Sequence, residues 1–166
     1  YQFVKNPYYG EYRLGEACQK VKTIDVKLMT LNECLAKAGI DQVDFLSLDI
    51  QGAEYDVLKS SEKLLQEKCV GIQFEVEFVE LYKEQKTFQD LHALMLEMGF
   101  DLIDIFSFGR LSPISLPLGF RSAEQPLYAD VAYLKQEQYL SHKKDYEQYY
   151  RSAFFSLLHK NMGHCL

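Results

Sequence analysis

The stretch "FLSLDIQGAEYDVL" (45–58) holds two carboxylates on either side of a glycine turn, a spacing that can bring both into one catalytic or ligand-binding site. Asp49 ends an apolar run that is typical of a strand, and Glu54 opens a predicted helix. Gly52 lies between them and allows backbone to approach a ligand closely, because it carries no side chain. Asp49 and Gln51 would also suit the start of the helix as caps, and position alone does not separate the two interpretations.

A second predicted strand, "VGIQFEVEF" (70–78), carries two further carboxylates. Alternation along a strand sends Phe74, Val76 and Phe78 to one face and sends Glu75 and Glu77 to the other. The interior of a parallel sheet rarely tolerates an unpaired carboxylate. We therefore expect the two glutamates either to open onto a site beside Asp49 or to lie in solvent. Carboxylates grouped in a partly dry cleft would raise one another's pKa and would offer a general base or a magnesium site.

An α/β fold is expected to position these residues. Helices are predicted after Thr30, Gly52 and Thr87, and a loop is predicted at 107–126. In the main sheet the first three strands should be parallel and the last antiparallel. The predicted strands are 22–28 (a half-exposed edge strand), 43–50 (buried on both faces), 70–78, 100–106 and 128–134.

Three segments are predicted along the chain. They are an N-terminal segment with the edge strand (1–29), a central domain (30–135) and a helical tail (136–166). The tail is amphipathic and is expected to pack or to mediate contacts between subunits. Its apolar residues are Phe154, Phe155, Leu157 and Leu158.

Composition and net charge argue against several classes of function. The chain has 166 residues and a net charge of −6, which argues against binding to nucleic acid or to an anionic membrane surface. No apolar run approaches the roughly 20 residues of a membrane span. The first residues lack the plan of a signal peptide. The four cysteines form no CxxC pair and are expected to be reduced thiols in a cytoplasmic protein.

The four histidines (His92, His142, His159 and His164) show no spacing typical of metal ligands, and His92 is expected on the outward face of a helix. No glycine-rich turn joins a strand to a helix before residue 39, so the sequence shows no nucleotide-binding motif there.

The stretches "TLNECLAKAGIDQVDFLSLDIQGAEYDVLKSSEKLL" (30–65) and "VGIQFEVEFVELYKEQKTFQDLHALMLEMGFDLIDI" (70–105) closely resemble the FkbM family of S-adenosylmethionine-dependent methyltransferases. The family pattern "vDflKiDvqGaEl.vLkGa" matches the Asp49 turn, and "Y.gq..f" matches Tyr82, Gln85 and Phe88. The stretch "YADVAYL" (128–134) resembles the closing strand of the family. Ser47 stands where many members have lysine, and Asn32 stands where many have aspartate.

The resemblance implies a Rossmann-like methyltransferase sheet, of which this chain supplies strands four to seven. In the family the first two strands hold the methionine and ribose parts of the cofactor. Neither strand is recognisable here, so we expect a fragment without the main cofactor-binding motif. The resemblance places Asp49 beside the methyl donor and the acceptor hydroxyl, as an orienting residue or base. The expected cofactor-binding residues are Asp49, Gln51 and Gly52, and the expected substrate-binding residues are Glu54, Glu75 and Glu77.

The implied function is an O-methyltransferase that uses S-adenosyl-L-methionine to methylate a hydroxyl of a sugar or another small metabolite. No metal ligand is predicted, although the grouped carboxylates are of a type that can bind a divalent metal ion. The main alternative is a non-catalytic binding or oligomerisation module that acts through the tail, and a metal-dependent hydrolase is a third. The expected partners are a small hydroxylated substrate and, through the sheet edge or the tail helix, a second copy of the chain.

Overall fold

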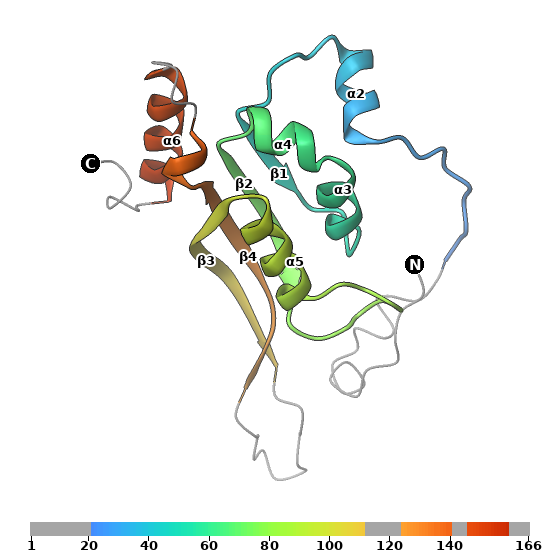
Figure 1. Ribbon diagram of the computed structural model, residues 1–166. Coiled ribbons are helices and arrows are strands. Elements are labelled where there is room, and N and C mark those ends of the chain that lie inside the picture. The colour runs from blue at the N-terminus through green and yellow to red at the C-terminus, as the bar shows by residue number, and fades with distance from the viewer. Residues whose placement is uncertain (1–20, 112–123, 141–145, 160–166) are drawn as a thin grey trace.

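The computed structural model describes residues 21–111, 124–140 and 146–159, and these segments form a mixed α/β structure around a four-stranded sheet (Figure 1). The order across the sheet is β1-β2-β4-β3. β1 is parallel to β2, and β4 is antiparallel to both of its neighbours, so β1, β2 and β3 all point the same way. This confirms the predicted directions. The strands are β1 (Phe45–Leu48), β2 (Gly71–Glu77), β3 (Phe100–Leu111) and β4 (Gln125–Lys135).

Helices lie on both faces of this sheet. The helices are α2 (Leu31–Ala38), α3 (Glu54–Ser60), α4 (Glu62–Lys68), α5 (Phe88–Glu97) and α6 (Tyr146–Leu158), with a 3-10 turn, η2 (Glu137–Tyr139). α3, α4 and α5 cover one face (Figure 1). α6 packs against the other face, where Phe155 meets Ala132 and Leu134 of β4.

Local sequence signals account for most of these boundaries. α2 and α5 each begin with a capping box, formed by Thr30 with Glu33 and by Thr87 with Asp90. The predicted helix after Gly52 is two helices in the structure. The chain departs from helical geometry at Ser61, whose φ is −109° and ψ is 9°. Leu58 and Leu65 nevertheless reach the same core, one from each helix.

The main core lies between the sheet and helices α3 to α5. Phe74 and Val76 of β2 are fully buried there and Phe78 is partly buried, as the alternation predicted, and Ile72 joins them. The rings of Phe74 and Tyr133 stack at 5.5 Å, which joins β2 to β4 through side chains as well as through the backbone. Burying an unpaired carboxylate in this apolar layer would cost stability. The side chains of Glu75 and Glu77 therefore point to the opposite face of the sheet.

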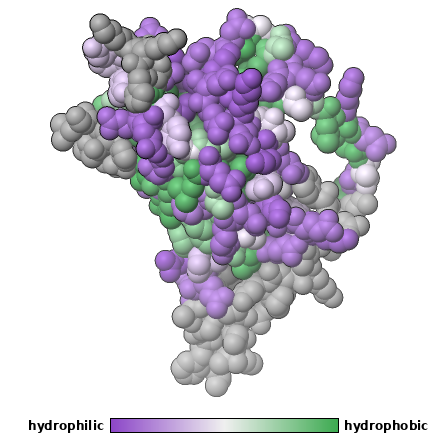
Figure 2. Space-filling model, in the orientation of Figure 1, coloured by the Kyte–Doolittle hydropathy of each residue, from purple (hydrophilic) through white to green (hydrophobic). Residues whose placement is uncertain are grey.

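The expected strand at 22–28 is wrong. Residues 21–30 have no regular secondary structure, and they stand away from the sheet with apolar residues on the surface (Figures 1 and 2). Ile24, Val26 and Leu28 are exposed. Alternation alone does not form a strand, because the backbone needs a neighbouring strand to bond, and none of the described strands pairs with this segment. Residues 1–20 lie outside the described part of the chain.

Two other expectations need correction. β1 is not buried on both faces, because Leu46 and Leu48 face the core whereas Phe45 and Ser47 are exposed. The loop predicted at 107–126 is shorter, since β3 extends to Leu111 and β4 starts at Gln125. Residues 112–123 are outside the described part.

The tail contains a helix, as predicted, but its buried face differs from the apolar set. Ser152, Phe155 and Ser156 are buried, whereas the other apolar residues of the set, Phe154, Leu157 and Leu158, are exposed. Small serine side chains allow α6 to lie close to the sheet, and Phe154 and Leu158 lie beside the start of β1 without being covered.

Candidate functional site

A tight turn follows the carboxyl end of β1 and presents Asp49 to solvent. Gln51 and Gly52 both have positive φ, of 56° and 98°. The side-chain amide of Gln51 donates to Oδ1 of Asp49 at 2.8 Å. Asp49 and Gln51 do not cap the following helix, whose N-cap residue is Ala53, without a side-chain bond. The capping interpretation is therefore wrong, and the two side chains are engaged with each other.

The Glu54 side chain stabilises this turn through hydrogen bonds to the backbone of the turn. The side chain folds back so that Oε1 accepts from the N–H of Ile50 at 2.9 Å and Oε2 accepts from the N–H of Gly52 at 2.8 Å. A left-handed conformation at a residue such as Gln51 costs about 1–2 kcal/mol. A hydrogen bond to a charged group contributes about 1.5–3 kcal/mol. Two such bonds exceed the cost of the left-handed residue, so Glu54 stabilises the turn.

The loop between β2 and α5 closes over the turn. A Cβ atom at Gly52 would lie 2.9 Å from Cδ2 of Tyr82 and 3.0 Å from Nε2 of Gln85, so only glycine fits there. Oε1 of Gln85 accepts from the N–H groups of Leu81 and Tyr82, which fixes the loop. The hydroxyl of Tyr82 donates to Oε1 of Gln51 at 3.4 Å. Asp49 is thus the end of a chain of contacts that begins in the neighbouring loop.

Carboxylates gather on the sheet face beside this turn, and we call them the carboxylate cluster: Asp49, Glu54, Glu75, Glu77 and Asp130. Glu75 of β2 is directly opposite Asp130 of β4. Burial raises the pKa of Glu75 above its usual range, and repulsion from Asp49, Asp130 and Glu54 raises it further. Of the two positions expected for the glutamates of β2, the one beside Asp49 is therefore observed for Glu75.

Glu77 is the most buried member of β2's pair, with 2% of its surface exposed. Burial raises the pKa of Glu77 to about 7, and the negative charges of Glu54 and Glu75 contribute to the rise. The Gln85 amide partly opposes the rise. Its Nε2 lies near Glu77 without meeting the geometry of a hydrogen bond to any described residue. Glu77 therefore accepts a proton near neutral pH but is covered from solvent.

The cluster does not form a metal centre within the described segments. Among residues 21–111, 124–140 and 146–159, no three His, Cys, Asp or Glu side chains converge as ligands. What the cluster offers is negative potential, which favours a positively charged ligand beside Asp49. The exposed carboxylate of Asp49 can also orient a hydroxyl and accept its proton.

Comparison with models of known protein families shows to which family this chain is related. A family model for the methyltransferase FkbM domain matches residues 10–102, more than half of the chain. The chain belongs to the FkbM methyltransferase family. No curated protein and no solved structure matches it significantly. The matched range of the FkbM domain contains the Asp49 turn, β2 and the loop with Tyr82 and Gln85, whereas Asp130 and α6 lie beyond it.

Some residues of this FkbM site were not found by sequence reasoning. The family pattern included the spacing of Tyr82 and Gln85 but gave them no role, and their contacts with Gly52 need the folded loop. Asp130 gave no signal, because its place opposite Glu75 depends on the register of β2 with β4.

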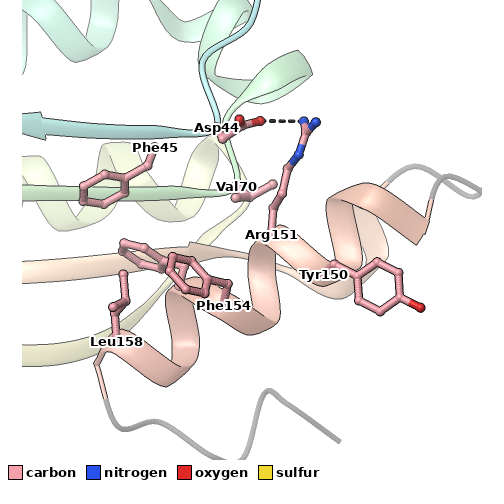
Figure 3. A pocket seen from close by; sticks show the side chains of 8 residues that line it. Asp44, Phe45, Val70, Tyr150, Arg151, Phe154 and Leu158 are labelled. Carbon is pink, nitrogen blue, oxygen red and sulfur yellow. Dashed lines mark hydrogen bonds and ion pairs between the residues drawn. The ribbon is translucent and has the colours of Figure 1, made fainter.

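A separate cavity of about 420 Å³ lies at the opposite end of β1 and β2 (Figure 3). It lies between α6 and the start of β1, and its lining is almost entirely apolar, with Phe45, Phe154 and Leu158 among the contributors. Arg151 of α6 joins Asp44 at the rim through an ion pair of 2.6 Å. Because Asp49 lies at the other end of β1, this cavity is not part of the Asp49 site.

The expectation that His92 faces outward is also wrong. Its Nδ1 lies 2.9 Å from the hydroxyl of the buried Tyr133, and its ring stacks on Phe88 at 5.4 Å. His92 therefore supplies a hydrogen-bond partner to a buried hydroxyl, which explains its position without a catalytic role.

None of the helices in the described residues combines the length and apolar character that crossing a membrane requires.

Proposed function

We propose that this chain is the acceptor-side part of an S-adenosylmethionine-dependent O-methyltransferase that methylates a hydroxyl of a sugar or another small metabolite. The observation that supports this most is the exposed Asp49 carboxylate, presented at the carboxyl end of a sheet strand by a braced turn. Among the described residues only Oδ1 of Asp49 has a hydrogen-bond donor. Oδ2 therefore remains for the acceptor hydroxyl.

The methyl donor supplies an electrophilic methyl group on a positively charged sulfur. Asp49 orients the acceptor hydroxyl toward this group. As the hydroxyl oxygen takes the methyl group and the sulfur keeps the bonding electrons, Asp49 accepts the hydroxyl proton. Alignment of donor and acceptor supplies most of the rate effect. The carboxylate cluster, including Glu75 at its partly exposed edge, favours the positive charge of the donor.

The residues of this chain fit only the reacting end of that donor. Gln51 and Gly52 are close enough to Asp49 to contact it there, whereas no glycine-rich turn precedes residue 39 to hold the rest. Among the described residues we assign none to the adenosine or the carboxylate of the donor. We also propose a cytoplasmic location, with which the thiols of Cys34 and Cys69 are consistent, since neither forms a disulfide among the described residues.

A methyl-transfer assay tests the proposal. The full-length protein is incubated with methyl-labelled S-adenosylmethionine and a panel of sugars and other hydroxylated metabolites. Asp49→Asn should lower kcat by about 100-fold or more, because proton transfer to a positioned group contributes about that much. Asp56→Asn, on the neighbouring helix, is the matched control and should retain activity. Absence of transfer to every acceptor class by the unaltered protein would refute the proposal.

One observation favours a second candidate, an oligomerisation module. Tyr150, Phe154 and Leu158 are exposed on α6 at intervals of four residues, so they form one apolar stripe. Two copies of such a stripe can pack about a twofold axis. Light scattering on the purified chain tests this candidate, since Phe154→Glu should convert a dimer into a monomer. A monomeric unaltered chain at high concentration would exclude the module.

A further inference from the structure

Glu54 is the most enclosed member of the carboxylate cluster together with Glu77, with 2% of its surface exposed. Both of its oxygens receive backbone N–H groups, from Ile50 at 2.9 Å and from Gly52 at 2.8 Å. A carboxylate that is covered and bonded in this way presents little to a substrate. Its position next to Asp49 therefore needs a different explanation.

The two hydrogen bonds act on the peptide groups on either side of the Ile50–Gln51 pair. The N–H of Ile50 belongs to the peptide that directly follows Asp49, and the N–H of Gly52 belongs to the peptide that follows Gln51. Holding both peptide planes restrains the backbone of Ile50 and Gln51 between them, where Gln51 has a φ of 56°, a left-handed value that is uncommon outside glycine. With the backbone restrained, the Gln51 side chain reaches Asp49 Oδ1 at 2.8 Å.

We propose that Glu54 is a positioning residue, which clamps the Ile50–Gly52 backbone and so orients the Asp49 carboxylate, and that it does not bind substrate. This inference rests on the proposed function of Asp49. It replaces the expectation from the family resemblance that Glu54 contacts the acceptor.

A simpler role would be stabilisation of the positive end of α3, since Glu54 is in its first turn. Asp56 is in the same turn and is exposed, yet no described hydrogen bond joins its side chain to the Asp49 turn. The two acidic residues therefore share any effect on the helix but differ in their contact with the turn. This difference makes Asp56 a matched control.

The first test measures hydrogen exchange of single backbone amides by NMR in the purified 166-residue chain. Glu54→Ala should accelerate exchange at Ile50 and Gly52 by about tenfold or more, because each loses a hydrogen bond to a charged group. Glu54→Gln retains one carbonyl oxygen and should accelerate exchange mainly at one of the two. Asp56→Ala should change neither. Unchanged exchange at both amides in Glu54→Gln would overturn the proposal even if Glu54→Ala failed to fold.

The second test measures methyl transfer by the full-length protein. Glu54→Ala should lower kcat by about 10- to 100-fold, the scale of misplacing a reacting group by about 1 Å, while KM for the acceptor changes less than about threefold. Glu54→Gln should recover part of kcat. A raised KM with unchanged kcat would mean that Glu54 binds the acceptor, and would overturn the proposal. If the unaltered protein transfers no methyl group, the proposed function fails, and the amide exchange still decides whether Glu54 clamps the turn.

Discussion

Replacing Glu77 by glutamine should remove much of the pH dependence of the stability of this chain. Burial raises the pKa of Glu77 from 4.5 to about 7. Between these values the folded chain holds a proton that the unfolded chain has released, so stability falls as pH rises through this range. Below about pH 4.5 Glu77 is neutral in both states and adds no penalty. Above about pH 7 the penalty is complete.

The size of this effect follows from the same two pKa values. One pKa unit corresponds to about 1.4 kcal/mol, so the rise represents about 3 kcal/mol for a fully enclosed group. Glu77 is 2% exposed, and Gln85 nearby already reduces the rise, so solvent screening removes only part of this value. We expect the free energy of unfolding to decrease by about 2–3 kcal/mol between pH 5 and pH 8 because of Glu77.

Urea unfolding followed by circular dichroism measures this change at several pH values. Glu77→Gln has nearly the same shape and no charge, so it should raise stability at pH 8 by about 2–3 kcal/mol and leave it nearly unchanged at pH 5. Glu75→Gln is the comparison, because the pKa of Glu75 is also raised but the residue is partly exposed. Its effect should be smaller. An unaltered pH slope in Glu77→Gln, or lower stability at pH 8, would refute the reasoning.

Three further outcomes are expected. The 166-residue chain alone should show no micromolar affinity for S-adenosylmethionine in titration calorimetry, because several polar contacts of about 1–3 kcal/mol each would be missing; a micromolar dissociation constant would contradict this. Gly71→Ala should lower the free energy of unfolding by about 1–3 kcal/mol in urea titrations, because a Cβ there would lie 2.6 Å from the Phe155 ring; unchanged stability would show that α6 yields at no cost. Alkylation with peptide mapping should modify the exposed Cys34 in the native chain but not Cys69, whose pKa burial raises to about 12; rapid native labelling of Cys69 would contradict its enclosure.

Local signals in the sequence predicted those elements whose ends are set by neighbouring residues. The capping boxes at Thr30 and Thr87 place α2 and α5, because each cap bonds within its own turn. The directions of the strands also followed from order and loop lengths. Alternation failed at 22–28, because a strand needs a partner and a period of two does not supply one.

The site was predictable in its location but not in its contacts. Asp49 stands at the end of β1, as the strand pattern and the family resemblance indicated. The clamp by Glu54 depends on a side chain that turns back toward the preceding turn, and a helical position alone does not show this direction. The cover that Tyr82 and Gln85 place over Gly52 joins residues about thirty positions apart in the chain, and only the fold brings them together.

The place of β4 between β2 and β3 has a consequence for synthesis on the ribosome. β2 and β3 are complete once residue 111 has been made, yet each lacks its shared neighbour until residues 125–135 emerge. Until then the Phe74 ring has no Tyr133 to stack on, and two strand edges stay open to other chains. A nascent chain that pauses before β4 is therefore expected to need chaperone protection, and a product truncated there is expected to aggregate. The edges of β2 and β3 are therefore protected from other chains only after β4, the last strand of the sheet, has been made.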